Sequence, residues 1–489
     1  MEFSSIDFIA FFGVLALLLW ATKIPFIVKA LTEEKLCKFR HITLLIFSYI
    51  FYGWWDWRFC FLMLSLTAIA YLSARSINEG KHPKRSLALG VAFPLVILGF
   101  FKYFNFFLSS FMALFSIKNV GALDIILPVG ISFYTFQSMS FTIDVYRGKI
   151  KNFPSFMHFA LYVSFFPQLV AGPIVKASDF LPQLEEKHRN ISIKNIEVGL
   201  QIFAFGLFKK VVIADHLSVF VDDVFLAPMN YHSISIILAV IAYSIQIYCD
   251  FSGYSDMAVG CAKCIGYDLM RNFNLPYISK NVSEFWKRWH ISLSSWLMEY
   301  LYIPLGGNRK GKARKYINLM LTMLLGGLWH GASWNFVIWG ALHGGALCIH
   351  KIFSERYGKK GYKNTFTKII CAFATYVFVC ICWVFFRSQD FSETLIILKK
   401  MVVWGDGIVQ PYVWTFFSAI VVAVCTIVAI RRSRDNFVVK KGIRTHVVEG
   451  YYPIVDLTKF WSLFAFILFV GFTICIAYTG ISPFIYFQF

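Results

Sequence analysis

The chain has 489 residues, of which 58% are hydrophobic, 19% are aromatic and only 15% are charged. Soluble domains carry about 25% charged residues, so a chain this apolar lacks the polar side chains that a water-exposed surface requires. The composition excludes a soluble globular protein and predicts an all-α polytopic membrane protein.

The net charge of +20 is concentrated in short segments between apolar runs. The cationic segments are Lys23–Arg40, Arg75–Arg85, Arg147–Lys151, Arg309–Lys315, Lys351–Lys368 and Arg431–Arg444. This distribution is typical of positive-inside topology and predicts that these segments lie on the cytoplasmic side. It argues against a nucleic-acid partner, because the charge does not form one basic surface.

Apolar runs of helical length recur along the whole chain, each near the ~20 residues that cross ~30 Å of hydrocarbon. Examples are Ile6–Ala21, Leu87–Phe101, Ile234–Ile247, Ile369–Phe386, Val413–Ile430 and Phe460–Ala477. The eleven cysteines are scattered through such runs, and the pair Cys261 and Cys264 has no second pair or nearby histidine. No metal site is therefore predicted.

Two segments are too interrupted to be straight spanning helices. In 121–150, Pro128 and Gly130 are followed by a series of Ser, Thr and Gln residues, and 162–190 contains Pro167, Gly172, Pro173 and Pro182. Broken backbone at membrane depth is tolerated only where protein or a cavity surrounds it. We expect the second segment to be re-entrant or interfacial. The first fits either helix packing or a cavity wall.

A polar cluster follows in 248–256, where Asp250, Ser252 and Asp256 lie at the end of an apolar run. Two interpretations remain open: a polar helix end that faces water, or a polar wall of an internal cavity.

The stretch 281–297 is predicted to be one helix that carries a histidine. Asn281 is a typical N-cap, with a glutamate three residues later that can reach back to the first turn. Trp286, Trp289 and His290 then follow at i, i+3 and i+4 and share one face. An ionisable side chain at membrane depth is costly enough to indicate function.

Cations accompany this face. Lys287 and Arg288 lie beside it, and Arg309 opens the next cationic segment. With Trp286 and Trp289 they would suit a ligand whose phosphate-bearing end stays in the cytosol, such as an acyl-CoA. The alternative is that these cations only enforce topology.

The stretch 319–344 is predicted to be a second helix. Its Gly-x-x-x-Gly motifs at 327–331 and 340–344 allow neighbouring helices to approach closely, so His330 is expected to face protein and not lipid. A neutral imidazole, with an ordinary pKa of about 6.5, can take a proton from a hydroxyl group. The alternative is a histidine hydrogen-bonded across helices. His343 lies further along and ranks lower.

At these residues the sequence resembles the membrane-bound O-acyltransferase (MBOAT) family, in the bacterial branch of the alginate O-acetylation protein and the D-alanyl transfer protein of teichoic acids. The matching strings are spread in order along the chain. They are Pro167-Gln168-Leu169-Val170-Ala171-Gly172-Pro173-Ile174, Tyr248-Cys249-Asp250-Phe251-Ser252-Gly253-Tyr254-Ser255-Asp256, Phe285-Trp286-x-Arg288-Trp289-His290-Ile291-Ser292-Leu293-Ser294, Pro304-Leu305-Gly306-Gly307-x-Arg309 and Gly327-Leu328-Trp329-His330-Gly331-Ala332.

The resemblance implies one membrane domain over 1–489, with about 11–13 transmembrane helices plus re-entrant or interfacial helices around a central funnel. It implies that His330 is the catalytic histidine and that His290 is the second histidine of this branch. The expected acyl donor is cytosolic acetyl-CoA, held near Trp286, Lys287, Arg288, Trp289 and Arg309. Acetyl-CoA is then a substrate, and no permanently bound cofactor is expected.

The C-terminal tail, 481–489, contains Phe484-x-Tyr486-x-x-Phe489. This string matches the motif F-x-Y-x-x-F of cell-envelope acylation systems, and it implies that Tyr486 relays the acyl group to an extracellular or periplasmic SGNH-type acetyltransferase. The charge distribution independently predicts that the tail lies outside. The alternative is an aromatic belt at the membrane interface.

The predicted function is a subunit of the bacterial plasma (inner) membrane that moves acetyl groups from cytosolic acetyl-CoA for O-acetylation of a cell-envelope or extracellular polysaccharide. His330 would be the general base, His290 would assist, and Tyr486 would carry the acyl group. The expected partners are acetyl-CoA, the SGNH-type transferase, the polysaccharide through that transferase, and membrane lipids. The rivals are a transporter of a small polar substrate, because carriers also use broken helices and buried polar groups, and a structural subunit of an envelope-assembly complex.

Overall fold

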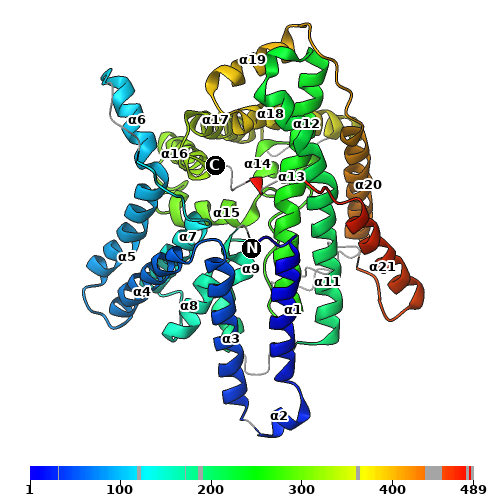
Figure 1. The fold of residues 1–489 in the computed structure, drawn as a ribbon. Helices are drawn as coiled ribbons and strands as arrows, with labels where there is room; N and C mark the ends of the chain where they lie inside the picture. Colours follow the sequence, from blue (N-terminus) through cyan, green and yellow to red (C-terminus); the bar gives the residue numbers. More distant parts are fainter. Residues whose placement is uncertain are drawn as a thin grey trace. The chain divides into compact units, whose positions relative to one another are not determined.

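The computed structural model describes residues 1–30, 32–117, 123–170, 172–185, 191–358, 364–435, 454–480 and 484–485. Within these ranges the chain is helical, and its only pairing of the β type is one isolated bridge between Tyr231 and Ile408. Figure 1 follows the helices from the N-terminus in blue to the C-terminus in red.

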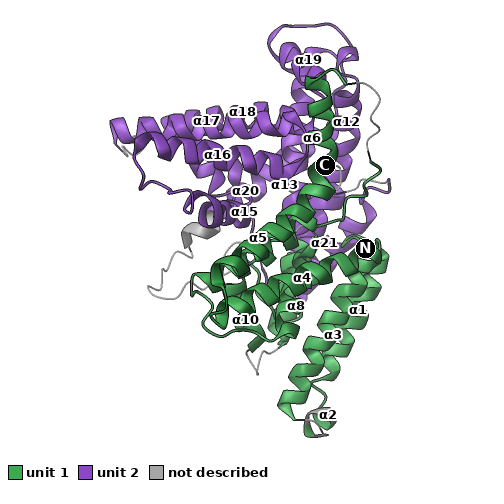
Figure 2. Cartoon of the chain, turned by 90° about the vertical axis from the view of Figure 1, so that its left-hand side faces the viewer, with its two compact units in different colours: residues 1–203, 257–269 green, residues 204–256, 270–489 purple. Residues whose placement is uncertain are grey.

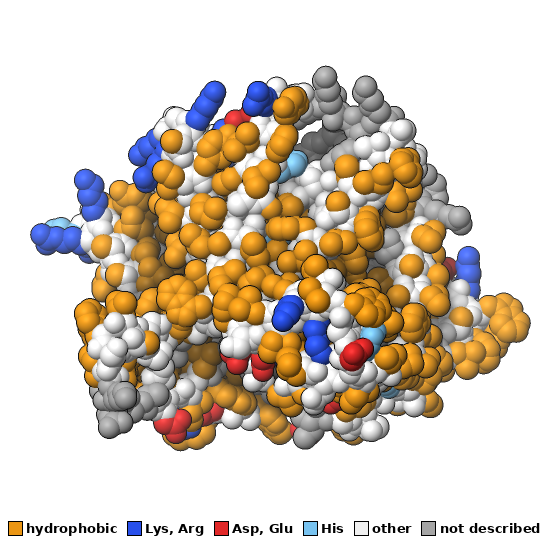
Figure 3. Space-filling model, turned by 90° about the horizontal axis from the view of Figure 1, so that it is seen from above, with side chains coloured by type: hydrophobic (Ala, Val, Ile, Leu, Met, Phe, Trp, Pro, Cys, Tyr) orange, Lys and Arg blue, Asp and Glu red, His pale blue; other side chains and the backbone are white. Residues whose placement is uncertain are grey.

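Six helices are long and apolar enough to span a membrane, which confirms the prediction of an all-α polytopic membrane protein. They are Arg58–Asn78, Pro83–Leu114, Ser233–Cys264, Trp334–Tyr357, Thr365–Arg387 and Val413–Ile430. Large apolar side chains on them point outward, such as Phe373, which is 67% exposed. Figure 3 shows a surface covered largely by hydrophobic side chains, with Lys and Arg in a few separate groups.

The chain divides into two compact units, coloured separately in Figure 2. Unit 1 comprises 1–203 and 257–269, and unit 2 comprises 204–256 and 270–489. Helices α11 (Ile193–Phe208) and α13 (Ser233–Cys264) contribute residues to both. The single domain expected over 1–489 stays a prediction.

Unit 1 holds the N-terminal helices, and its interrupted segments break as the sequence predicts. Its further elements are α1 (Ile6–Ala21), α2 (Pro25–Ala30), α3 (Glu33–Gly53), α4 (Arg58–Asn78), α5 (Pro83–Leu98), η1 (Gly99–Tyr103), α6 (Phe104–Leu114), α7 (Ile131–Tyr146), α8 (Phe156–Ser164), α9 (Phe166–Leu169) and α10 (Ala177–Glu185). Helix α7 begins after Gly130, whose φ of +73° suits glycine, and nearly all of its side chains are buried. Burial on all sides favours the helix-packing interpretation of 121–150.

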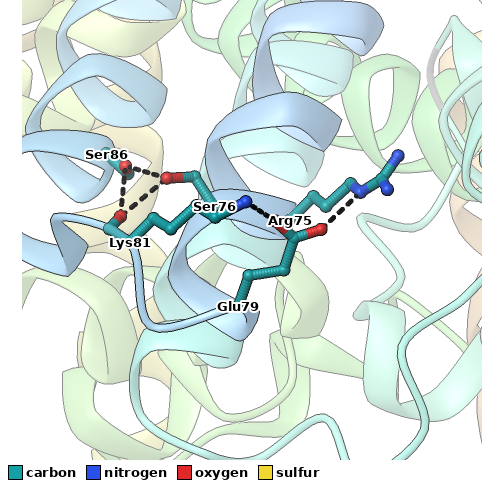
Figure 4. A network of polar contacts seen from close by, with 5 residues as sticks. All are labelled: Arg75, Ser76, Glu79, Lys81 and Ser86. Carbon is teal, nitrogen blue, oxygen red and sulfur yellow. Dashed lines mark hydrogen bonds and ion pairs between the residues drawn. The ribbon is translucent and has the colours of Figure 1, made fainter.

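The loop between α4 and α5 carries part of the predicted cationic segment Arg75–Arg85 (Figure 4). Glu79 accepts from Arg75 Nε at 2.7 Å and from Lys81 Nζ at 2.8 Å. These hydrogen bonds, first from Lys81 and then from Arg75, hold the pKa of Glu79 below its usual value. Ser76 Oγ donates to the Lys81 carbonyl at 2.7 Å and accepts from Ser86 Oγ at 2.8 Å, so side chains of both helices fix the turn.

Unit 2 holds the remaining described elements. They are η2 (Lys209–Ala214), α12 (Asp215–Leu226), η3 (Pro228–Asn230), η4 (Pro276–Ile278), α14 (Val282–Trp286), α15 (Ile291–Trp296), η5 (Leu297–Tyr302), α16 (Lys312–His330), α17 (Trp334–Tyr357), α18 (Thr365–Arg387), α19 (Phe391–Val402), α20 (Val413–Asp435) and α21 (Phe460–Cys475). The elements η2 and η5 are π-helical turns, a rare form that is frequent at functional sites.

Helices α16 and α17 form a tight hairpin, with α18 beside them (Figures 1 and 2). The single helix predicted over 319–344 is therefore wrong: α16 ends at His330, and Ser333 caps α17 by accepting from the Asn335 amide. Gly331 lies between the helices in extended conformation. Both Gly-x-x-x-Gly motifs do mediate close approach, since Gly327 of α16 lies against Gly340 of α17.

We predict that Gly340→Ala destabilises the protein by about 1–3 kcal/mol through overpacking. An added Cβ would overlap the carbonyl oxygen of Met323 on α16. The control is Gly345→Ala on the same helix, where the added Cβ meets nothing within 4 Å. Thermal unfolding of the detergent-solubilised protein should show a lower midpoint for Gly340→Ala alone, and equal midpoints would contradict the hairpin packing.

Candidate functional site

The first candidate histidine lies in a turn between α14 and α15. Asn281 does cap α14, because its Oδ1 accepts from the Glu284 amide at 2.8 Å, and Glu284 reaches back to the Lys280 amide at 3.1 Å. The helix predicted over 281–297 is nonetheless wrong. Helix α14 ends at Trp286, and α15 begins after His290.

The turn is held by the segment that precedes it, and this explains the break. Asn272 accepts from the Ile291 amide at 2.9 Å through its carbonyl and from Ser292 Oγ at 2.6 Å through its side chain. His290 adopts a φ of +40°, which costs a side chain other than glycine about 1–2 kcal/mol. Strain of this kind collects at functional sites.

His290 is completely buried, and neither of its ring nitrogens has a hydrogen-bond partner among the described residues. Its ring lies edge-on to Phe251 with centroids 4.7 Å apart, and 6.0 Å from the ring of Trp329. Burying polar nitrogens without partners is costly. The described residues therefore leave the hydrogen-bonding capacity of both ring nitrogens unused.

His330 is the last residue of α16 and is 4% exposed, so it faces protein as the sequence predicts. Its ring packs against Trp329, Trp339 and Phe386 with centroid distances of 5.0, 5.0 and 5.1 Å. Both predicted catalytic histidines therefore contact the indole ring of Trp329.

A third buried histidine joins this aromatic cluster. His343 of α17 is fully buried, and its ring lies 4.8 Å from Trp339. Trp286 Nε1 donates to His343 Nδ1 at 3.3 Å, which leaves the proton of a neutral imidazole on Nε2. The sequence ranks His343 low, although its i, i+4 spacing from Trp339 indicates a shared face.

The residues predicted to hold the acyl donor occupy different environments. Lys287 and Arg309 are exposed. Arg288 is half-buried, pairs with Glu284 at 2.9 Å and donates to the Asn274 carbonyl at 3.0 Å.

The two tryptophans of this set lie within the protein. Trp289 is 2% exposed and stacks on Phe285, with centroids 5.6 Å apart. Trp286 is half-buried, with its indole N–H donated to His343. A donor role for the whole set stays a prediction.

The described part of the tail, Phe484 and Ile485, lies against α13, the helix that carries Phe251. Phe484 is 1% exposed and packs on Tyr254 at 4.7 Å and on Phe251 at 6.0 Å. The Ile485 amide donates to Asp250 Oδ2 at 2.8 Å. Phe251 therefore contacts Phe484 and His290. Tyr486 and Phe489 lie outside the described residues.

Known proteins resemble this chain over most of its length. A probable alginate O-acetylase of Azotobacter vinelandii is 37% identical over 483 residues, which cover 92% of this chain and 95% of the relative. The chain belongs to the membrane-bound O-acyltransferase family. The family model itself matches residues 149–389, which include His290, His330 and the α16–α17 hairpin.

As a member of the membrane-bound O-acyltransferase family, the protein is an acyltransferase and a multi-pass membrane protein. A probable alginate O-acetylase of Pseudomonas putida is 42% identical over 376 residues, covering 76% of each chain. A peptidoglycan O-acetyltransferase of Helicobacter pylori is 39% identical over 405 residues, covering 77% of this chain and 76% of the relative.

Proposed function

We propose that this acyltransferase is the O-acetyltransferase subunit that moves acetyl groups from cytosolic acetyl-CoA across the bacterial plasma membrane for O-acetylation of a cell-envelope polysaccharide. The names of the similar proteins, two alginate O-acetylases and a peptidoglycan O-acetyltransferase, support acetyl as the acyl group and a polysaccharide as the final acceptor. One observation carries the site assignment. His290 and His330 both contact Trp329, and Phe251 contacts both His290 and Phe484 of the tail.

In this proposal acetyl-CoA is a substrate that enters from the cytosol. Lys287 and Arg309 are exposed cations, and in this proposal they attract the phosphates of acetyl-CoA. Arg288 takes a positioning role, since its pairing with Glu284 and the Asn274 carbonyl stabilises the turn that carries His290.

His330 acts as the general base. It takes the phenolic proton of Tyr486, whose usual pKa of about 10 leaves it a weak nucleophile without a base. The phenolate oxygen attacks the thioester carbonyl carbon, and the carbon–sulfur bond breaks. The coenzyme A thiolate then takes the proton from His330, so the products are an acetyl ester of Tyr486 and the free thiol. His290 assists by donating to the developing oxyanion.

The ester on Tyr486 is then passed on outside the membrane. A hydroxyl group of an SGNH-type transferase attacks the ester carbonyl and regenerates the phenol, and the polysaccharide receives the acetyl group from that transferase. Buried packing of Phe484 on Phe251 and Tyr254 supports a tail that reaches toward the histidines. The proposed topology has the C-terminus outside, in agreement with the cationic segments between the apolar runs.

The experiment is to incubate purified full-length protein in lipid nanodiscs with acetyl-CoA labelled in the acetyl group. We expect coenzyme A to be released and label to stay on the protein until the partner transferase is added. D-Alanyl and long-chain acyl donors should give much lower rates. No release of coenzyme A by folded protein, with or without the partner, would overturn acetyl-CoA as the donor.

A further inference from the structure

The C-terminal segment is bound through its backbone by a buried carboxylate. Asp250 on α13 is 3% exposed, and its Oδ2 accepts from the Ile485 amide at 2.8 Å. Asp250 and Ile485 are separated by 235 positions in the sequence, so this contact is a tertiary attachment and not a local turn.

The carboxylate belongs to a buried ionic group in unit 2. Asp250 Oδ1 lies 2.8 Å from Lys210 Nζ, and the same ammonium group lies 2.8 Å from Asp215 Oδ1. Lys210 is in the π-helical turn η2 and Asp215 opens α12. A carboxylate buried this deeply requires donors on both oxygens. Lys210 supplies one of them and the tail amide supplies the other.

The same turn of α13 also binds the side chain of Phe484. Phe251 and Tyr254, the residues one and four positions after Asp250, hold the ring of Phe484. A second backbone contact lies upstream, where the Tyr478 amide donates to the Val211 carbonyl of η2 at 3.0 Å. The segment is therefore attached at two places to η2 and α13.

We propose that Lys210 and Asp250 form a latch that recognises the tail backbone at Ile485 and sets the position of the next residue, Tyr486. The latch binds the backbone N–H of Ile485 and not its side chain. Recognition of a side chain comes from Phe484, which packs on Phe251 and Tyr254. The purpose of the latch, to present Tyr486 to the histidines, rests on the proposed function. The attachment itself does not.

The test measures how fast carboxypeptidase A releases Phe489 from the full-length protein, followed by intact-mass spectrometry. Ile485→Pro deletes the donated N–H and leaves the ionic group unchanged, while Ile485→Ala keeps the N–H. We expect release to be about tenfold faster for Ile485→Pro than for Ile485→Ala, because a hydrogen bond to a charged group is lost.

Asp250→Ala should accelerate release to a similar extent, and the double variant Asp250→Ala/Ile485→Pro should be no faster than either single variant, because both changes remove the same hydrogen bond. The control is Asp222→Ala, which removes a carboxylate of α12 that pairs with Arg387. This control should release Phe489 at the wild-type rate.

Equal release from Ile485→Pro, Ile485→Ala and wild type would overturn the latch, as would acceleration by Asp222→Ala equal to that by Asp250→Ala. Because protection from the protease requires no acyl donor, the latch can hold while Tyr486 is never acetylated. If Tyr486 is acetylated while the variants do not differ in protection from carboxypeptidase A, the latch is excluded and the proposed function stands.

Discussion

His330→Ala should lower the initial rate of coenzyme A release from acetyl-CoA by about a thousandfold, the range expected when a general base is lost. The imidazole lies among Trp329, Trp339 and Phe386 and is 4% exposed. Bulk water therefore has little access to replace it as a proton acceptor. The measurement is the initial rate with full-length protein in nanodiscs at saturating acetyl-CoA, with the partner transferase present.

Two variants separate chemistry from packing. His330→Gln keeps a polar side chain of similar length but is not a base, so it should be as slow as His330→Ala while unfolding closer to the wild-type temperature. His232→Ala is the control, because His232 packs on Trp404 and lies outside the aromatic cluster. A His330→Gln protein that keeps a tenth or more of the wild-type rate would contradict a proton-accepting role for His330.

Tyr486→Phe should abolish acetyl transfer to the partner transferase, with a loss of about 10⁴-fold or more, because the variant lacks the nucleophile. The change removes one oxygen atom, so the tail should remain attached through Phe484 and Ile485. Transfer is measured as acetylated partner protein per unit time, with Tyr486→Phe present in the membrane at the wild-type level.

The double variant Tyr486→Phe/Phe487→Tyr moves the phenol by one position along the chain. If the attachment at Ile485 fixes the register, this protein should stay inactive although it has a tail tyrosine. Wild-type transfer by Tyr486→Phe alone would exclude the relay. Restored transfer by the double variant would show that the register of the phenol is not fixed.

Helix positions could largely be predicted from the sequence, because apolar runs of spanning length leave few alternatives in a membrane. Helix α1 begins and ends as expected, and the run expected over 413–430 lies within α20. The prediction over 281–297 is wrong because tertiary hydrogen bonds override local periodicity there. Asn272 holds the turn before α15, and nothing in the spacing of Trp286, Trp289 and His290 indicates that interaction.

The candidate site was predicted in part. His290 and His330 were identified because ionisable groups at membrane depth are rare. The contact of His330 with Trp339 depends on the hairpin turn at Gly331, which a pattern of apolar residues does not reveal. The hydrogen bond between Trp286 and His343 joins two helices that are distant in sequence, so residue spacing does not predict it. The tail contact with Asp250 likewise joins residues far apart in the chain.

The most direct measurement is mass spectrometry of the C-terminal peptide after the full-length protein has been incubated with acetyl-CoA in the absence of the partner. The proposed mechanism predicts an acetyl ester on Tyr486 in the wild type, none in His330→Ala, and loss of the ester when the partner transferase is added. Acetylation of the partner at the wild-type rate while Tyr486 is never acetylated would contradict the relay.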